Sequence, residues 1–405
     1  MAAEPALAAV PHESLGRLFL RFLRFGSLAW GGPVVQIAML RHSFVDEERW
    51  VTSEHFNRVL ALYQVLPGPE AHELCVYFGM LARGRIGGML AGLGFMLPGF
   101  VLMFLLSWLY VRFGLNTGGA WAVVFAAVQA AVAGVIVRAV HRIGSHVLKN
   151  AWLWTVVLLA TVAQLLEVHF ALILVGGGLI YVFADQRRTT LAGGLALASL
   201  IGLIALGGYA AVEQVPTLPV APEAANGEVS LPQLFLSGLK AGALTFGGAY
   251  TVIPFLQQDA VYGGGWMSNQ QFLDGVALGG LLPAPLIIFA TFVGYLGGGA
   301  AGAVVLTAGI FLPAFALTLI GHHPLERLVH QPRVRGLLDG VTAAVVGLIA
   351  GTAITLCIVT IRDLQSAAVF LFAVTVAFIS RSKLAIPLII TAAVTWGLVV
   401  GSMTN

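Results

Sequence analysis

The sequence predicts an all-α polytopic membrane protein, with two homologous modules in inverted topology and with broken or re-entrant helices. Three observations lead to this prediction. Of the 405 residues, 59% are hydrophobic and only 10% are charged, whereas soluble domains carry about 25% charged residues. Apolar runs of membrane-spanning length recur along the chain. Finally, the first part of the sequence is repeated in the second part. Lipid must therefore be the solvent for most of the surface.

Thirteen apolar runs are separated by short polar connections. Seven runs precede residues 213–232, which are rich in Pro and Ala and lack Lys and Arg, as is typical of an exposed linker. The sequence thus predicts about thirteen membrane segments in two modules, residues 1–212 and 233–405, joined by this linker. The runs lie near 17–40, 56–80, 88–111, 120–140, 151–166, 170–184 and 191–212, and then near 234–256, 272–296, 300–321, 337–361, 366–380 and 384–401.

An internal repeat relates the two modules. Residues 19–69 align without gaps with residues 235–285 at an offset of 216, and the recurring positions include a Gly-Gly pair, a Trp and a Pro-x-Pro motif. One residue is then lost, and residues 79–98 match residues 294–313 at an offset of 215. Chance matches of Gly and Leu would not keep this register, so the chain consists of two copies of one module.

The two copies are predicted to be inverted. Seven runs separate their starts, and an odd number of crossings places these starts on opposite sides of the membrane. If the first two segments of each copy are re-entrant, five crossings separate the starts and the inversion remains. With the N-terminus inside, fifteen of the 21 Lys and Arg residues, Arg83 and Arg85 among them, fall in inside connections, and five, including Arg58, fall outside. This asymmetry follows the positive-inside rule.

A Gly-Gly pair lies in the first segment of each module, Gly31-Gly32 in the first and Gly247-Gly248 in the second. Paired glycines close to a proline favour an interrupted helix with exposed backbone amides, which can bind an anion. Close packing of helices through small residues is the alternative explanation.

A cation precedes each glycine pair by seven residues: Arg24 in the first module and Lys240 in the second. Two helical turns place each cation on the same face as its glycine pair. A cation among apolar residues is costly in a membrane, so we interpret the pair as symmetric charges that attract an anion. The alternatives are snorkelling of Arg24 to the inner interface, and snorkelling of Lys240 or its pairing with Asp274.

A Pro-x-Pro motif interrupts the second segment of each module: Pro67-Gly68-Pro69 in the first and Pro283-Ala284-Pro285 in the second. Two prolines with this spacing do not fit inside a regular helix, but proline suits the first turn of a new one. Each motif therefore predicts a half-helix whose N-terminus presents unpaired N–H groups to an anion. A simple proline kink is the alternative.

Three titratable residues, Glu70, His72 and Glu73, follow the first Pro-x-Pro motif and have apolar counterparts in the second module. Carboxylates and histidines in membrane segments often relay protons, so these residues are candidates for proton coupling. Asp274 and Asp339 are weaker candidates. The alternative is that Glu70 neutralises the N-terminus of its own helix.

Several other classes of site are not predicted. The net charge of +3 comes from short connections between apolar runs, which does not indicate binding of nucleic acid. Cys75 and Cys357 lie far apart in apolar runs, so neither a disulfide framework nor a metal site is expected. No Walker A loop, HExxH motif or GxSxG motif occurs in a suitable context, and no nucleophile, base and orienting group cluster in the sequence. We expect no cofactor and no catalytic residues.

The motif sequences resemble those of the chromate ion transporter family. The resemblance rests on GSLAWGGPVVQIAMLRHSFVDEERWVTSEHF and LPGPEAHEL in the first module, and on LTFGGAYTVIPFLQQ, LLPAPLIIFATFVGYLG and GIFLPAF in the second. The two-module length is similar to the long-chain branch of this family. By this resemblance, the basic position of the family falls on Arg24 and Lys240. Trp30 stands where the family usually has Phe, and Ala284 stands where it has Gly.

The resemblance implies a secondary transporter that exports chromate, or a related tetrahedral oxyanion such as sulfate, across the inner membrane of a bacterium. A channel for anions or small solutes is the alternative from another class. The sequence leaves open the direction of flux, the coupling ion, and whether the working unit is a monomer or a homodimer.

Overall fold

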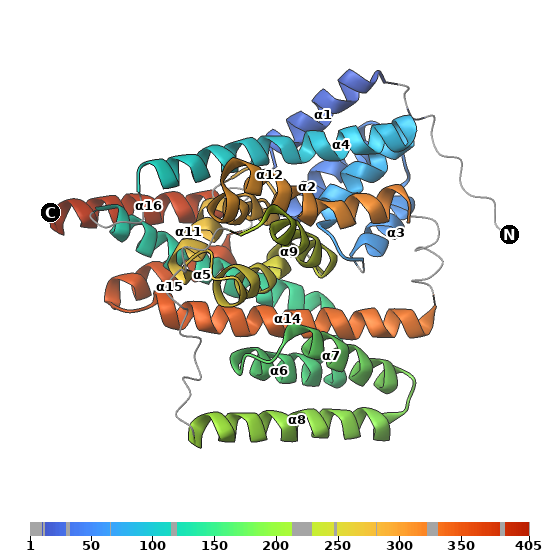
Figure 1. Ribbon diagram of the computed structural model, residues 1–405. Helices are drawn as coiled ribbons and strands as arrows, with labels where there is room; N and C mark the ends of the chain where they lie inside the picture. Colours follow the sequence, from blue (N-terminus) through green and yellow to red (C-terminus); the bar gives the residue numbers. More distant parts are fainter. Residues whose placement is uncertain are drawn as a thin grey trace.

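A computed structural model describes residues 10, 13–29, 33–64, 66–114, 120–212, 229–246, 249–280, 282–321, 331–380 and 385–404. All regular secondary structure in these ranges is helical (Figure 1), as predicted. The elements are α1 (Leu15–Ser27), α2 (Pro33–Arg41), η1 (His42–Glu47), α3 (Ser53–Tyr63), α4 (Glu70–Arg112), α5 (Ala120–Val147), α6 (Ala151–Leu165), α7 (Phe170–Asp185), α8 (Thr189–Val212), α9 (Leu231–Ala243), η2 (Ala249–Thr251), α10 (Val252–Gln257), η3 (Gln258–Gly263), α11 (Asn269–Gly280), η4 (Leu286–Phe289), α12 (Ala290–Leu319), α14 (Pro332–Thr360), α15 (Leu364–Ile379) and α16 (Ala385–Thr404).

Within the described ranges, six helices are long and apolar enough to cross a membrane, and α6, α7 and α15 are shorter apolar helices. The chain is therefore a multi-pass membrane protein. Some of the predicted runs are not continuous helices, because the run near 17–40 divides into α1 and α2 and the run near 56–80 divides into α3 and the start of α4. The six long stretches are 70–112, 123–145, 189–209, 286–319, 334–360 and 385–402.

The repeat is visible in the positions of the elements. Helices α1 and α9 begin 216 residues apart, as do the two π-helices η1 and η3. The later pairs α5 and α14, α6 and α15, and α7 and α16 follow in the same order, so the repeat continues beyond the motifs that align in the sequence. No helix follows α16 in the described residues as α8 follows α7.

Helices α4 and α12 each reverse direction at a glycine. Non-helical backbone interrupts α4 at Arg83-Gly84 and α12 at Gly298-Gly299, and φ is +61° at Gly84 and +58° at Gly299, a conformation that favours glycine. The short arm 70–82 of α4 folds back on its long arm 85–112. In agreement, a Cβ atom built at Gly79 would lie 2.5 Å from the Cβ of Ala91.

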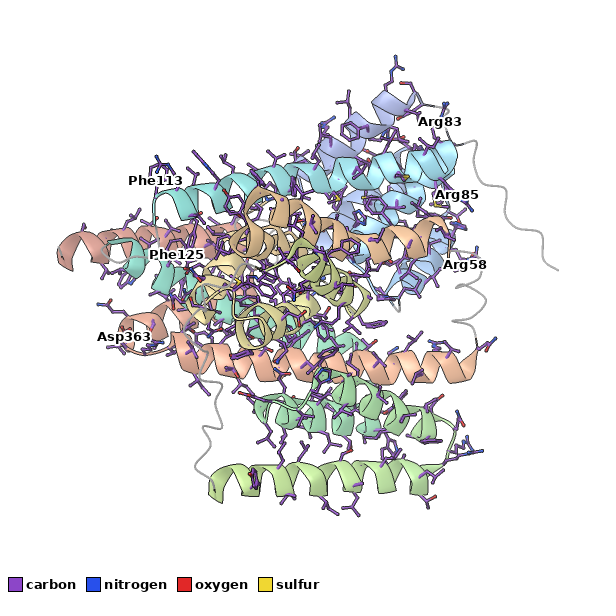
Figure 2. The ribbon with its side chains drawn as sticks, viewed as in Figure 1. Arg58, Arg83, Arg85, Phe113, Phe125 and Asp363 are labelled. Atoms are coloured by element: carbon purple, nitrogen blue, oxygen red, sulfur yellow. The ribbon has the colours of Figure 1, made fainter. Side chains whose placement is uncertain are left out.

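The ends of the long arm of α4 lie at opposite ends of the molecule. Figure 2 places Arg83 and Arg85 at one end and Phe113 at the other. Arg58 lies at the same end as Arg83 and Arg85 (Figure 2). These three cations thus share one end of the molecule, away from Phe113.

The two modules interleave in three dimensions. The α4 helix packs against α12, α5 packs against α14, α15 and α16, and α14 packs against α6 and α7. One large cluster of buried apolar side chains includes residues of both modules. Helix α8 lies at the edge of the molecule and contacts α6 and α7 (Figure 1). The modules are thus repeats in sequence that share a large hydrophobic cluster, and a second cluster belongs to the first module alone.

Backbone contacts fix the position of the first helix of each module. Gly26 of α1 lies against the carbonyl oxygen of Phe95 in α4, and Gly242 of α9 lies against the carbonyl oxygen of Ile310 in α12. Small residues at such crossings let the helix backbones touch. Gly26 and Gly242, which recur in the sequence at an offset of 216, therefore have the same packing role in the two copies.

Candidate functional site

The first Pro-x-Pro motif begins a new helix, as predicted. Helix α3 ends at Tyr63, and α4 begins at Glu70 with Pro69 as its N-cap residue. The amides of His72 and Glu73 both donate to the carbonyl oxygen of Pro69, so the amides of the preceding residues belong to the orphan donors of a helix N-terminus. In the second module, Pro285 precedes the 3-10 helix η4, and α12 follows from Ala290.

The break in one module contacts the break in the other. The amide of Gly68 donates a hydrogen bond of 2.8 Å to the carbonyl oxygen of Thr245, which lies just after the end of α9. The Gly68 amide is therefore already bonded within the protein. Gly31, Gly32, Gly247 and Gly248 lie outside the described residues. The structure thus joins the second break of the first module to the segment that leads into the glycine pair of the second.

In each Pro-x-Pro motif, the middle residue and the residue that it contacts in a neighbouring helix are one glycine and one alanine. Gly68 has a φ of +152°, and a Cβ atom built on it would lie 3.2 Å from the Cβ of Ala314. At the equivalent place in the other copy, Ala284 lies against Gly99. Ala284 is not among the described residues with positive φ. The alanine therefore fits in the second motif because its backbone differs from that of Gly68 and its neighbour is a glycine.

Replacing Gly99 by alanine is expected to destabilise the protein by about 1–3 kcal/mol, because the new Cβ atom would overlap that of Ala284. The Gly99→Ala/Ala284→Gly double variant should recover most of the lost stability, since it moves the methyl group from one side of the contact to the other. Thermal unfolding in detergent measures both effects. A double variant no more stable than Gly99→Ala would contradict this contact.

Lys240 is paired with an acid that the sequence interpretation did not identify. Its ammonium group forms an ion pair with Asp259 of η3, and it lies 5.2 Å from the centre of the Phe170 ring. The Ser237 hydroxyl donates a 2.8 Å hydrogen bond to the other oxygen of Asp259. The alternative pairing of Lys240 with Asp274 is wrong. At the offset of 216, Asp259 aligns with Ser43 of the first module. This difference between the two copies is the only feature of the sequence that points to the ion pair of Lys240 with Asp259.

Arg24 has a different environment from Lys240, although the two positions are equivalent. Its side chain is exposed in the last turn of α1, whereas Lys240 is half-buried. The side chain of Arg24 forms no hydrogen bond or ion pair with any of the described residues. The two cations are thus not a symmetric pair in this structure. Arg24 is the one that is open to solvent or to a lipid headgroup.

The three titratable residues after Pro69 are all buried. Glu73 is fully buried, and within the part of the chain that the structure describes both of its carboxylate oxygens and one oxygen of Glu70 lack a hydrogen-bond partner. The ring of His72 packs between Phe311 and Phe315, with centroid distances of 4.9 and 4.7 Å. Buried carboxylates without partners are expensive, so this cluster is the strongest chemical feature of the first break.

A further cation lies beside this cluster. Arg142 of α5 interacts electrostatically with Glu70 and with Tyr250 of η2. Tyr250 comes two residues after the second glycine pair. The interaction links α5, the first Pro-x-Pro break and the second Gly-Gly segment. No local motif in the sequence marks Arg142, because only the fold brings it to Glu70.

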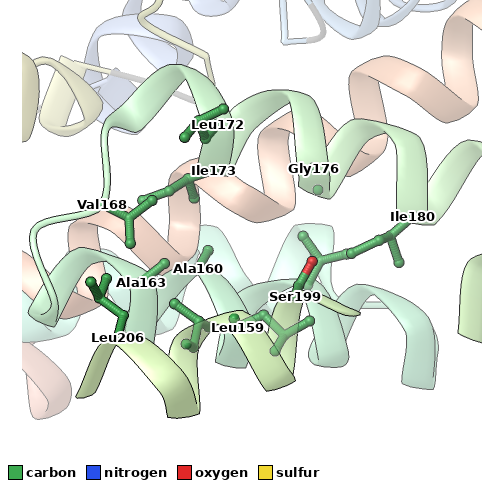
Figure 3. A pocket seen from close by; sticks show the side chains of 14 residues that line it. Leu159, Ala160, Ala163, Val168, Leu172, Ile173, Gly176, Ile180, Ser199 and Leu206 are labelled. Carbon is green, nitrogen blue, oxygen red and sulfur yellow. The ribbon is translucent and has the colours of Figure 1, made fainter. Parts of the chain in front are cut away.

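The cavities differ in chemical character. A cavity of about 230 Å³ lies between α6, α7 and α8 (Figure 3). Apart from Ser199, its lining residues are apolar or glycine, so it is unsuited to a charged ligand. A second cavity, of about 20 Å³, is lined by polar residues such as Gln164, Glu167 and Gln257, together with Phe170. Through Phe170 it adjoins Lys240.

The fold and the breaks together define a class of protein: a multi-pass helical membrane protein built from two homologous modules whose discontinuous helices meet inside the molecule. Comparison with known proteins identifies its family. The family model described as Chromate transporter matches residues 16–182 and 232–398. The chain belongs to the chromate transporter family, in its long, two-module form.

Curated relatives support this membership. The chain is 52% identical over 392 residues to a chromate transport protein of Pseudomonas aeruginosa, covering 95% of this chain and 92% of the relative. It is 33% identical over 394 residues to a chromate transport protein of Cupriavidus metallidurans, covering 96% and 94%. It is also 33% identical over 400 residues to a probable chromate transport protein of Synechococcus elongatus, covering 96% of each chain. No solved structure matches.

Proposed function

We propose that this protein is a secondary transporter that exports chromate, or a related tetrahedral oxyanion such as sulfate, across the inner membrane of a bacterium. The hydrogen bond between Gly68 and Thr245 carries this proposal, because it joins discontinuous helices of both modules at one place. Transporters with repeated modules often bind their substrates where such helices meet. The names of the curated relatives supply the substrate.

The proposed site uses charge from Arg24 and Lys240 and backbone donors from the helix breaks. These breaks are Gly31-Gly32, Gly247-Gly248, Pro67-Gly68-Pro69 and Pro283-Pro285. Arg142 is added to the positive groups because of its interaction with Glu70. Glu70, His72 and Glu73 are proposed to handle the coupled protons. Protonation of Glu70 and Glu73 would remove the negative charge that otherwise repels an oxyanion.

We further propose that the modules, residues 1–212 and 233–405 on either side of the linker, have inverted topology, with the end that carries Arg58, Arg83 and Arg85 in the cytoplasm. Figure 2 supports this arrangement by placing these three cations together and Phe113 and Asp363 at the opposite end. If the first two segments are re-entrant, Arg58 moves to the inner side. The charge asymmetry on which the positive-inside rule depends then increases.

The decisive test is flux in proteoliposomes that contain the purified protein. Labelled chromate and labelled sulfate are each offered with and without the other anion, at two values of an imposed pH gradient. We expect concentrative chromate movement that follows the gradient and is inhibited by the competing oxyanion. Flux that only dissipates the chromate gradient would identify a channel. No chromate flux at all, with sulfate transported, would exclude chromate as the substrate.

A further inference from the structure

A further buried carboxylate lies between the modules, away from the Pro-x-Pro break of the first module. Asp274 of α11 is 1% exposed. One of its oxygens accepts a 2.5 Å hydrogen bond from the Tyr110 hydroxyl of α4, and the other accepts a 2.6 Å hydrogen bond from the Gln129 amide of α5. The acid thus comes from the second module and both donors come from the first.

No cation compensates this carboxylate among the described residues. Helices α10, α12 and α16 and the segment η4, which also pack against or adjoin α11, contain no Asp, Glu, His, Lys or Arg. The acid of η3, Asp259, is paired with Lys240. Tyr110 itself packs against aromatic rings. The centre of its ring lies 5.0 Å from the centre of the Phe292 ring and 5.6 Å from that of the Phe125 ring. Two neutral donors therefore hold a buried acid in apolar surroundings.

The hydrogen-bond chemistry of this cluster accommodates both protonation states. An ionised Asp274 accepts from both donors, as observed. When a proton from water binds the oxygen next to Tyr110, the new O–H group can donate to the tyrosine oxygen, because a hydroxyl group both donates and accepts. Only the tyrosine hydrogen has to rotate. If Asp274 only held the modules together, a group that can only donate a hydrogen bond would be sufficient. The Tyr110 hydroxyl can both donate to Asp274 and accept from it.

The position of the cluster also separates it from Glu70 and Glu73. Tyr110 lies two residues before the end of α4, the end that Figure 2 marks with Phe113, and Phe125 lies on the same side. The short arm that begins at Glu70 runs instead toward Arg83 (Figure 2). Glu70 and Glu73 thus lie at the end of the short arm that is farther from Arg83, whereas Tyr110 lies near the Phe113 end of the long arm.

We propose that Asp274 is a second proton-binding site of the transport cycle, which exchanges protons with the side of the membrane at the Phe113 end, with Tyr110 as its hydrogen-bond partner. This inference rests on the proposed function. The Oδ–H bond forms when a proton arrives from water on that side, and it breaks when the proton leaves. On binding, an O–H bond of a hydronium ion breaks as the Oδ–H bond forms, and on release the proton returns to a water molecule.

Asp274→Asn tests the proposal, because asparagine has the same shape and resembles the protonated acid. Two fluxes are measured in proteoliposomes: chromate counterflow without a pH gradient, and chromate accumulation driven by a pH gradient. We expect accumulation to fall by at least about tenfold while counterflow remains near that of the wild type. Unchanged accumulation, or an equal loss of both fluxes, would overturn the proposal.

Tyr110→Phe is the second variant, and it tests the same proposal if Asp274→Asn does not fold. It keeps the acid and removes the reversible partner, so accumulation should slow while counterflow persists. Tyr209→Phe, at an exposed position of α8, is the matched control. A Tyr110→Phe protein that accumulates chromate like this control would contradict the proposal. A wild type without counterflow would instead show that the proposed function itself is wrong.

Discussion

Replacing Lys240 by methionine is expected to reduce chromate counterflow by at least about tenfold, since losing a charged hydrogen-bond partner costs about 1.5–3 kcal/mol. The structure gives this result two competing explanations. Lys240 either binds the oxyanion or only neutralises Asp259, with which it is paired. In the second case the single substitution would harm the protein by leaving a largely buried carboxylate without its cation.

The Lys240→Met/Asp259→Asn double variant separates the two explanations. It removes both charges, so the protein should unfold at nearly the wild-type temperature. If Lys240 binds the substrate, the double variant stays inactive. If counterflow returns, Lys240 serves only Asp259 and does not belong to the site. Arg17→Met, at an exposed position in α1, controls for the general loss of positive charge.

Replacing Gly242 by alanine is expected to have the largest effect on stability, about 3 kcal/mol or more. The new Cβ atom would be forced into the carbonyl oxygen of Ile310, which is backbone and cannot move aside as a flexible side chain could. Helices α9 and α12 would have to separate. Thermal unfolding in detergent and the yield of folded protein measure the effect.

The control for Gly242→Ala is the same substitution in open space. A Cβ atom built at Gly194 of α8 meets no other atom within 4 Å, so Gly194→Ala should be neutral or slightly stabilising, by up to about 1 kcal/mol. Gly26→Ala should resemble Gly242→Ala, because Gly26 makes the equivalent contact with Phe95. A Gly242→Ala protein that melts like Gly194→Ala would show that the crossing can relax.

Much of the fold could be predicted because its causes are local. Apolar composition determined the membrane class, and paired prolines determined where α3 gives way to α4. The repeat gave the order of the elements, and the structure keeps the predicted offsets even at the π-helices η1 and η3. The reversals inside α4 and α12 were harder to predict. The reversal at Gly84 depends on backbone angles that a single glycine in an apolar run does not reveal.

The candidate site was less predictable, because its members come from distant parts of the chain. Arg142 interacts with Glu70 only because the fold brings these distant parts of the chain within electrostatic range. The pairing of Lys240 with Asp259, and not with Asp274, depends on which side chains face each other after the modules interleave. The tolerance of Ala284 depends on Gly99 in a different helix.

The sequence by itself determined that this is a two-module helical membrane protein of the chromate transporter type, with breaks at matched positions. Hydropathy, proline geometry and internal identity are properties of the chain, and each acts over a few residues. Only the tertiary structure decided the partners of the buried charges. Asp274 with Tyr110, and Lys240 with Asp259, are pairings across packed helices, where burial forces each polar group to find a partner within a few ångströms.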